Sequence, residues 1–484
     1  RYGYRDDRTP ISVADAQWAE DALNAYLAAY PRGQYAASAK GLLRRVYWFS
    51  GQRDKLAREY EALVARRAHS VAAMIATSEE IDLKLLGGAM THDVSNPTLL
   101  ATIDLARMRS SSSETSEDIV YSLHCCRNPI TRTELEAQRS HFAGNEALFE
   151  LLLANYAYYV DYNPREVLRL IPDAARETRY SHLQFSRQML RGLALEALHD
   201  RNALGFWREL IGGAGAGHQQ QGIQLAIALH HERGGSVDQV FAEGSPVRVP
   251  YIREQLILNS AGPALLRRLN ADSHVEQRER DMALFTLLYK QLTRREYADF
   301  VSDVTIAPPA AAGEQAPGDL RWAQAINTGF FHNTASDPHF ACSPLPETAA
   351  RLARNRNDVR SRMCLAEFMR LNGFDDSPLQ GYDWNQSLED TGRNTPPALG
   401  RAPSAYPEGD YSRLNVYRSV IANRAASADD RAYALYRALW CYARSGYNSC
   451  GGVEADVAQR GAWFRQLHRD YPSSHWSRSL DIYW

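Results

Sequence analysis

Apolar residues recur at steps of three and four along most of this chain of 484 residues. That spacing places them on one face of an α-helix. Between residues 13 and 68 it predicts three helices, which end where Pro31 and Gly33, and then Gly51, interrupt the pattern. The apolar positions of these helices are Leu23, Tyr26, Leu27 and Tyr30, then Leu42, Leu43, Val46 and Tyr47, then Leu56, Tyr60, Leu63 and Val64.

The same spacing continues through most of the remaining chain, in segments with the length of a helix. Alternation with a period of two, which marks β-strands, is scarce, so no β-sheet domain is predicted. Short connections between helices favour antiparallel neighbours, and the pattern therefore predicts an all-α solenoid of helix hairpins. The further helical segments are residues 145–160, 180–199, 223–231, 278–291, 347–371, 427–443 and 457–470.

Three interruptions divide the chain. A glycine-rich stretch at 211–217 is expected to be a flexible link, and a Pro- and Ala-rich stretch at 306–318 has the composition of a linker. A third stretch, 374–411, is rich in Pro, Gly, Asp and Asn and contains Tyr382, Trp384 and Tyr406, so it is either an ordered strap or a binding loop. The predicted regions are an N-terminal helical-repeat region at 1–210, a middle helical region at 218–301, a linker or mobile loop at 302–319, and a C-terminal helical region at 320–484 with a long loop at 374–411.

One sequence unit occurs near both ends of the chain. When Tyr30-Pro31 is aligned with Tyr471-Pro472, apolar residues coincide at eight and five positions before the proline, and an aromatic residue follows four positions after it. Proline ends the first helix because it cannot continue the hydrogen-bond ladder, and small residues follow where the next helix begins. The aromatic residue, Tyr35 or Trp476, is expected to pack back on the first helix.

This unit resembles the tetratricopeptide-like repeats of BamD/YfiO-type outer-membrane assembly lipoproteins. The similarity is specific over residues 14–67 and 462–484. It implies a tetratricopeptide-like helical-repeat solenoid, a fold whose concave face binds peptides or protein domains. The residues that carry it are Ala25, Tyr26, Leu27, Tyr30, Pro31, Tyr35, Ala36 and Ala39, followed by Gly51, Asp54, Ala57 and Tyr60.

Charge and hydropathy exclude some classes of partner. The formal net charge is −2, so no overall field favours nucleic acid or anionic lipid, and nucleic acid is not expected as a partner. No run approaches the roughly 20 apolar residues that a transmembrane helix needs. The start at Arg1 rather than Met fits the removal of a signal peptide, and equally a trimmed chain.

Six cysteines permit disulfides, and one pairing is predicted. Cys441 and Cys450 flank the turn-like sequence Ser445-Gly446-Tyr447-Asn448, which can bring the two sulfurs together. The alternative is a pair of buried thiols on either side of a loop. A disulfide favours a periplasmic or secreted protein, whereas free thiols favour a cytoplasmic one. The other cysteines are Cys125, Cys126, Cys342 and Cys364.

Candidate catalytic and metal-binding residues give only weak signals. His230-His231-Glu232 lacks the i, i+4 spacing of a zinc-binding histidine pair and is interpreted as a polar helix end. His124-Cys125-Cys126 has no second ligand pair nearby, and His332, Asp337 and His339 lie in a turn-like segment. No nucleophile elbow, phosphate loop, dinucleotide fingerprint or H-E-x-x-H motif is present, so no catalytic, cofactor-binding or metal-binding residue is predicted.

The sequence therefore favours a non-catalytic scaffold that binds protein partners in a bacterial cell-envelope or surface assembly. One alternative is a helical-toroid enzyme or binding protein for cell-wall or other polysaccharide, with Glu146, Glu232 or Glu367 as its acid. Another is a cytoplasmic repeat-protein regulator that encloses a peptide or a second subunit.

Overall fold

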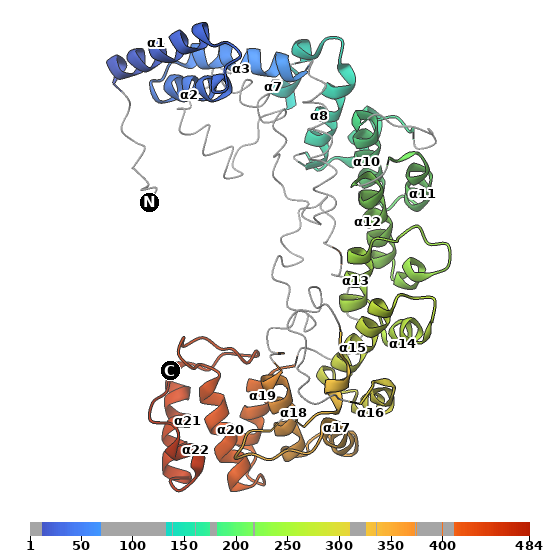
Figure 1. The fold of residues 1–484 in the computed structure, drawn as a ribbon, viewed down its shortest axis with the longest axis vertical. Helices are drawn as coiled ribbons and strands as arrows, with labels where there is room; N and C mark the ends of the chain where they lie inside the picture. Colours follow the sequence, from blue (N-terminus) through green and yellow to red (C-terminus); the bar gives the residue numbers. More distant parts are fainter. Residues whose placement is uncertain are drawn as a thin grey trace. The chain divides into compact units, whose positions relative to one another are not determined.

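The structure is a computed structural model of the chain (Figure 1). It describes residues 12–68, 132–137, 139–159, 161–174, 182–215, 218–309, 326–334, 336–372, 374, 399 and 411–484. Within these ranges the regular elements are α-helices and short 3-10 helices, and the sole β-type pairing is one isolated bridge between Asp337 and Phe340. The prediction of an all-α fold is confirmed.

The described helices form two compact units. Unit 1 ends at His230 and unit 2 begins at His231, so the division falls within helix α12 (His218–Arg233). The glycine-rich stretch before α12 is partly helical, because α11 (Ala203–Gly213) continues to Gly213. The prediction of a flexible link at 211–217 is therefore wrong for its first three residues.

In unit 1, helices that follow each other in the sequence pack against each other. Contacts join α1 to α2, α2 to α3, α8 to α9, α9 to α10 and α10 to α11. The first three of these helices match those predicted between residues 13 and 68. The elements are α1 (Val13–Ala29), α2 (Ala36–Phe49), α3 (Arg53–Ala68), α7 (Arg132–Glu136), η1 (Arg139–Phe142), α8 (Glu146–Tyr159), α9 (Pro164–Leu170), α10 (His182–Ala197), α11 and the first part of α12.

A buried carboxylate joins the first three helices. Glu20 on α1 is 7% exposed, and its Oε2 lies 2.7 Å from the Lys55 Nζ of α3. The hydroxyl of Tyr47 on α2 donates to Glu20 Oε1 over 3.1 Å. Burial, followed by the hydrogen bond to Glu20, raises the pKa of Tyr47 to about 12, so this hydroxyl stays protonated as a donor. A charged residue thus fixes how the helices of this segment pack.

The aromatic residues of the repeated Tyr-Pro unit do not pack as predicted. Tyr35 is 61% exposed. Trp476 is buried, but its ring centroid lies 4.2 Å from that of Tyr433 and 5.2 Å from that of Tyr436. Both tyrosines are on α20 (Ala428–Trp440) rather than on the preceding helix α21 (Val457–Asp470). The single-turn helix α22 (His475–Arg478), which carries Trp476, contacts both helices.

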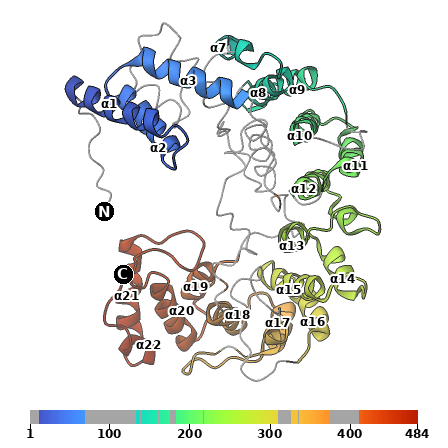
Figure 2. The ribbon, with the colours of Figure 1, turned by 45° about the horizontal axis from the view of Figure 1, so that its top comes forward.

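Unit 2 continues the pattern of neighbour contacts. Each helix from α14 to α21 packs on the next in sequence, and Figure 2 shows α18 to α21 side by side. Besides the end of α12 and α22, its elements are η2 (Val237–Phe241), α13 (Pro250–Asn259), α14 (Pro263–Ala271), α15 (Gln277–Thr293), α16 (Tyr297–Asp303), η3 (Val304–Ile306), η4 (Gly329–His332), α17 (Leu345–Arg354), α18 (Val359–Leu371), α19 (Arg413–Ala422), α20 (Ala428–Trp440) and α21 (Val457–Asp470).

Two apolar cores fill unit 2. One surrounds α15, which is buried from Met282 to Thr293, and it contains close aromatic rings from α15, η4 and α18. The other lies among α18, α19, α20 and α21. A helix whose residues are buried on all sides has no face in solvent, and this part of α15 therefore lacks the polar stripe of a surface helix.

The predicted linker and long loop are only partly described. The linker at 302–319 begins inside α16 and η3, which continue to Ile306, so its predicted start is wrong. Residues 310–319 lie outside the described residues. The same is true of most of the loop at 374–411, including Tyr382, Trp384 and Tyr406, and of His124, Cys125 and Cys126.

Candidate protein-binding surface

Two pairs of cysteines lie at disulfide distance in unit 2. The Sγ atoms of Cys441 and Cys450, the pair that the sequence predicts, are 2.06 Å apart. The Ser449 amide donates to the Cys441 carbonyl over 2.8 Å and closes the intervening turn. A second pair, Cys342 and Cys364, has its sulfurs 2.15 Å apart and links the segment before α17 to α18. No sequence signal had paired these two, because no turn-like sequence connects them.

We expect both disulfides to contribute to stability. A disulfide reduces the conformational entropy of the unfolded chain. This stabilises the folded state by about 2.5 kcal/mol for a loop of about ten residues and by about 3.5 kcal/mol for a loop of about 23 residues. The double variant Cys342→Ala/Cys364→Ala should therefore lower the free energy of unfolding more than Cys441→Ala/Cys450→Ala does. Urea unfolding of the oxidised proteins measures both losses. If reduction of the wild-type protein left its urea midpoint unchanged, the expectation would be wrong.

Two acidic residues that the sequence analysis considered separately meet in one buried ion network. Arg437 on α20 donates from Nη2 to Asp337 Oδ2 over 2.7 Å, and its Nε lies 3.4 Å from Glu367 Oε1. Arg370 donates to Glu367 Oε2 over 2.6 Å. Glu367 is 0% exposed and its carboxylate lies between two guanidinium groups, which give it charge-assisted contacts on both sides.

A tyrosine completes this network. The Tyr433 hydroxyl accepts a hydrogen bond from Arg437 Nε over 2.8 Å. Burial raises the pKa of Tyr433 far above its usual range, and the nearby negative charge of Glu367 adds to the shift. The phenol stays neutral at any physiological pH. The network therefore acts as a fixed set of ion pairs and hydrogen bonds among α18, α20 and the segment before α17.

The other candidate acids also have structural partners. Glu146 begins α8 and accepts a hydrogen bond from the Gly144 amide over 2.9 Å, and this bond lowers its pKa. Glu232 is buried at the end of α12, where the Ser260 hydroxyl donates to it. The neighbouring histidines contact other groups: His230 Nδ1 lies 2.9 Å from Glu196 Oε1, and His231 Nδ1 lies 3.0 Å from the Ser236 hydroxyl.

The structure does not bring His332, Asp337 and His339 together as one site. His332 Nε2 lies 3.2 Å from the Ala307 carbonyl oxygen, and Asp337 pairs with Arg437. The His339 ring stacks on the His475 ring with centroids 3.7 Å apart. Among the residues that the structure describes, no group of three or more His, Cys, Asp or Glu side chains is placed to hold a metal ion.

A buried lysine was not found by the sequence analysis. Lys290 lies in the middle of the α15 core and is 3% exposed, with its Nζ donating to the Asn259 carbonyl over 2.9 Å. Burial, and next the charge of Arg294, lower the pKa of Lys290 to about 7. A single lysine in a helical sequence ordinarily faces solvent, so the sequence carried no signal for this position.

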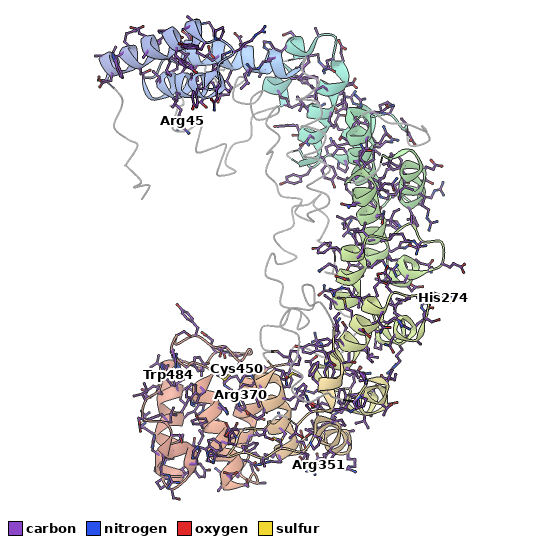
Figure 3. All side chains as sticks on the ribbon, viewed as in Figure 1. Arg45, His274, Arg351, Arg370, Cys450 and Trp484 are labelled. Carbon is purple, nitrogen blue, oxygen red and sulfur yellow. A yellow bond between two sulfur atoms is a disulfide. The ribbon has the colours of Figure 1, made fainter. Side chains whose placement is uncertain are left out.

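Apolar side chains at the ends of α20 and of the chain, together with Phe464, are exposed or half-buried. Trp440 ends α20, and its ring centroid lies 5.3 Å from that of Trp484, which is labelled in Figure 3. Tyr483 lies beside Phe464 of α21, with centroids 5.3 Å apart. Ile482 is 61% exposed, and Trp440 and Tyr483 are each 37% exposed. We call Trp440, Phe464, Ile482, Tyr483 and Trp484 the Trp440/Trp484 surface.

The chain beneath this surface is held firmly. His468 of α21 lies with Nε2 3.0 Å from the Leu480 carbonyl and with Nδ1 2.9 Å from the Ser477 hydroxyl, which ties the last residues to α21. Cys441, directly after Trp440, is bonded to Cys450. Rigid aromatic side chains bury much area in an interface at a low cost in entropy, and exposed apolar patches mark interaction sites.

Comparison of the chain with models of known protein families, with curated protein sequences and with solved structures gave no match. The similarity to BamD-type repeats therefore stays a prediction. In the described part of the chain, no helix is both long enough and apolar enough to cross a membrane.

Proposed function

We propose that this protein is a non-catalytic helical-repeat scaffold that binds a protein partner in the cell envelope. The observation that carries the proposal is the Trp440/Trp484 surface, in which Trp440, Ile482 and Tyr483 are exposed and the half-buried Trp484 lies beside Trp440. Tryptophan and tyrosine are the residues that contribute most often to the energy of protein interfaces. Such a surface fits a partner that presents an apolar segment.

Two further observations support the scaffold over the alternatives. Helices that pack mainly on their neighbours in sequence are typical of repeat proteins, which commonly work by binding. The acids considered for polysaccharide chemistry are engaged in a helix start, a buried hydrogen bond and an ion network. The two cysteine pairs favour an oxidising compartment over the cytoplasm.

A photocrosslinking amino acid at position 482, introduced in the producing cell, tests the proposal. We expect a discrete adduct with one protein, and we expect Trp440→Ala to reduce its yield several-fold because an exposed aromatic ring of the surface is lost. The matched control carries the crosslinker at Glu347, an exposed residue of α17 that is not part of the Trp440/Trp484 surface.

Two outcomes would contradict the proposal. One is the absence of any adduct from position 482 while the protein remains a folded monomer. The other is an identical set of adducts from positions 482 and 347, because nonspecific contacts give the same products at both positions.

A further inference from the structure

A separate pocket lies in unit 2, on the other apolar core. It is formed by α14, α15 and the residues next to η3 and η4, and has a volume of about 460 Å³. This volume is within the range of sites for small molecules, roughly 300–1,000 Å³. His274, labelled in Figure 3, lies in the connection between α14 and α15. The polar residues that line the pocket are Asn270, Gln277, Arg280, Asp281, Asn327 and Thr328.

Asp281 brings a carboxylate with an open oxygen to this pocket. Gln277 Nε2 donates to its Oδ1 over 2.7 Å. Among the described residues, no cation forms an ion pair with Asp281, and its Oδ2 accepts no hydrogen bond. Burial raises the pKa of Asp281, while the hydrogen bond from Gln277 and the charge of Arg280 act in the opposite direction. A hydrogen-bond donor with a positive charge, such as an ammonium group, is the chemistry that this carboxylate lacks.

Arg280 brings the opposite charge to the same pocket. Its guanidinium donates to Gln277 Oε1, while the amide nitrogen of Gln277 bonds Asp281. Gln277 therefore forms a hydrogen bond with both the positive and the negative group. Within the described ranges, Arg280 also forms no ion pair with an acid. A positive and a negative group in one pocket complement a ligand that carries one charge of each sign.

The remaining lining is aliphatic. Leu284 and Ile326 are buried in the wall, whereas Ile306 is 55% exposed at the pocket and Pro308 follows it. Among the lining residues that the structure describes, none is aromatic. The apolar part fits an aliphatic side chain.

We propose that this pocket binds an aliphatic α-amino acid or the equivalent end of a short peptide. The α-ammonium group bonds Asp281, the carboxylate or the first peptide carbonyl faces Arg280, and the side chain lies against Ile306 and Ile326. The two sources share one chemistry, a free α-ammonium next to a carboxyl or carbonyl oxygen. This site is independent of the Trp440/Trp484 surface and goes beyond the proposed scaffold function.

Isothermal titration calorimetry of the full chain tests the pocket with three probes. They are L-leucine, the dipeptide Leu-Leu, and N-acetyl-L-leucine, which lacks the ammonium group. We expect saturable binding of leucine or of the dipeptide, and at least tenfold weaker binding of the acetylated probe because a charge-assisted hydrogen bond is lost. Tighter binding of leucine assigns a free amino acid as the ligand, and tighter binding of the dipeptide assigns a peptide end.

Variants locate the binding. Asp281→Asn keeps the size of the side chain and an oxygen for Gln277, and it should weaken binding at least tenfold, as should Arg280→Gln. Glu347→Gln, the same change at an exposed site, should leave the dissociation constant unchanged, and circular dichroism checks that each variant is folded. The proposal is overturned if neither leucine nor the dipeptide gives saturable heat. Equal binding of the acetylated probe, or wild-type affinity in both folded pocket variants, would overturn it as well.

Discussion

Replacing Glu367 by alanine is expected to lower the free energy of unfolding by about 3–5 kcal/mol, because breaking a buried ion pair leaves the opposite charge buried without compensation. Glu367 is 0% exposed, and its partner Arg437 has a side chain that is 9% exposed. After the change, Arg437 keeps Asp337, while Arg370, labelled in Figure 3, loses its carboxylate. Urea or thermal unfolding, followed by circular dichroism, measures the loss.

The matched control for Glu367→Ala is Glu347→Ala on α17. Glu347 also pairs with an arginine on its own helix, Arg351, but at 4.0 Å and with a side chain that is 62% exposed. Exposed pairs of this kind contribute about 0.5 kcal/mol or less. If both variants lost the same stability, the buried ion network would contribute no more than an exposed ion pair, and the expectation would be wrong.

Replacing Gly192 by alanine is expected to cost about 3 kcal/mol, at the upper end of the range for overpacked cores. A Cβ atom on Gly192 of α10 would lie 2.1 Å from Cη2 and 2.5 Å from Cζ2 of Trp207. Trp207 is 0% exposed and donates from Nε1 to Glu196 over 3.0 Å, so the indole has no free space into which to move. The free energy of unfolding from a urea titration is the measurement.

Gly205 on α11 provides the opposite control. No atom lies within 4 Å of the Cβ position there, and the residue is exposed on a helix. Gly205→Ala should therefore raise stability by up to about 1 kcal/mol, as alanine does in helices. A stabilising effect of Gly192→Ala as well would show that Trp207 can give way, which contradicts the close contact.

The sequence predicted the helices because helix formation is a local property. Periodic apolar residues placed α1, α2 and α3 correctly, and the cysteines 441 and 450 were paired because the turn between them is local as well. Gly192 shows where prediction from sequence ends. From the sequence alone, this glycine is only a residue that weakens a helix. The structure shows that its missing side chain leaves space for the indole of Trp207.

The candidate sites depend on contacts between residues far apart in the chain, which periodicity does not encode. Asp337 and Glu367 were each considered alone, whereas Arg437, which joins them, lies 100 positions after Asp337. Trp440 ends α20 and Trp484 follows the last helix, so their contact depends on how the elements between them pack. The pocket likewise combines α15 with residues near 327, which no local pattern connects.

The two disulfides determine how unit 2 can come apart. Where each helix packs on its neighbours in sequence, unfolding can begin at an end by fraying and then spread inward one helix at a time. Cys441 to Cys450 closes the connection between α20 and α21, and Cys342 to Cys364 fastens α18 to the segment before α17. Both bonds precede α21 and α22 in the chain, so α21, α22 and the last residues are held to the rest of unit 2 by noncovalent packing alone. We therefore expect unfolding of unit 2 to begin at α22 and α21, and to slow where it reaches the covalently closed segments.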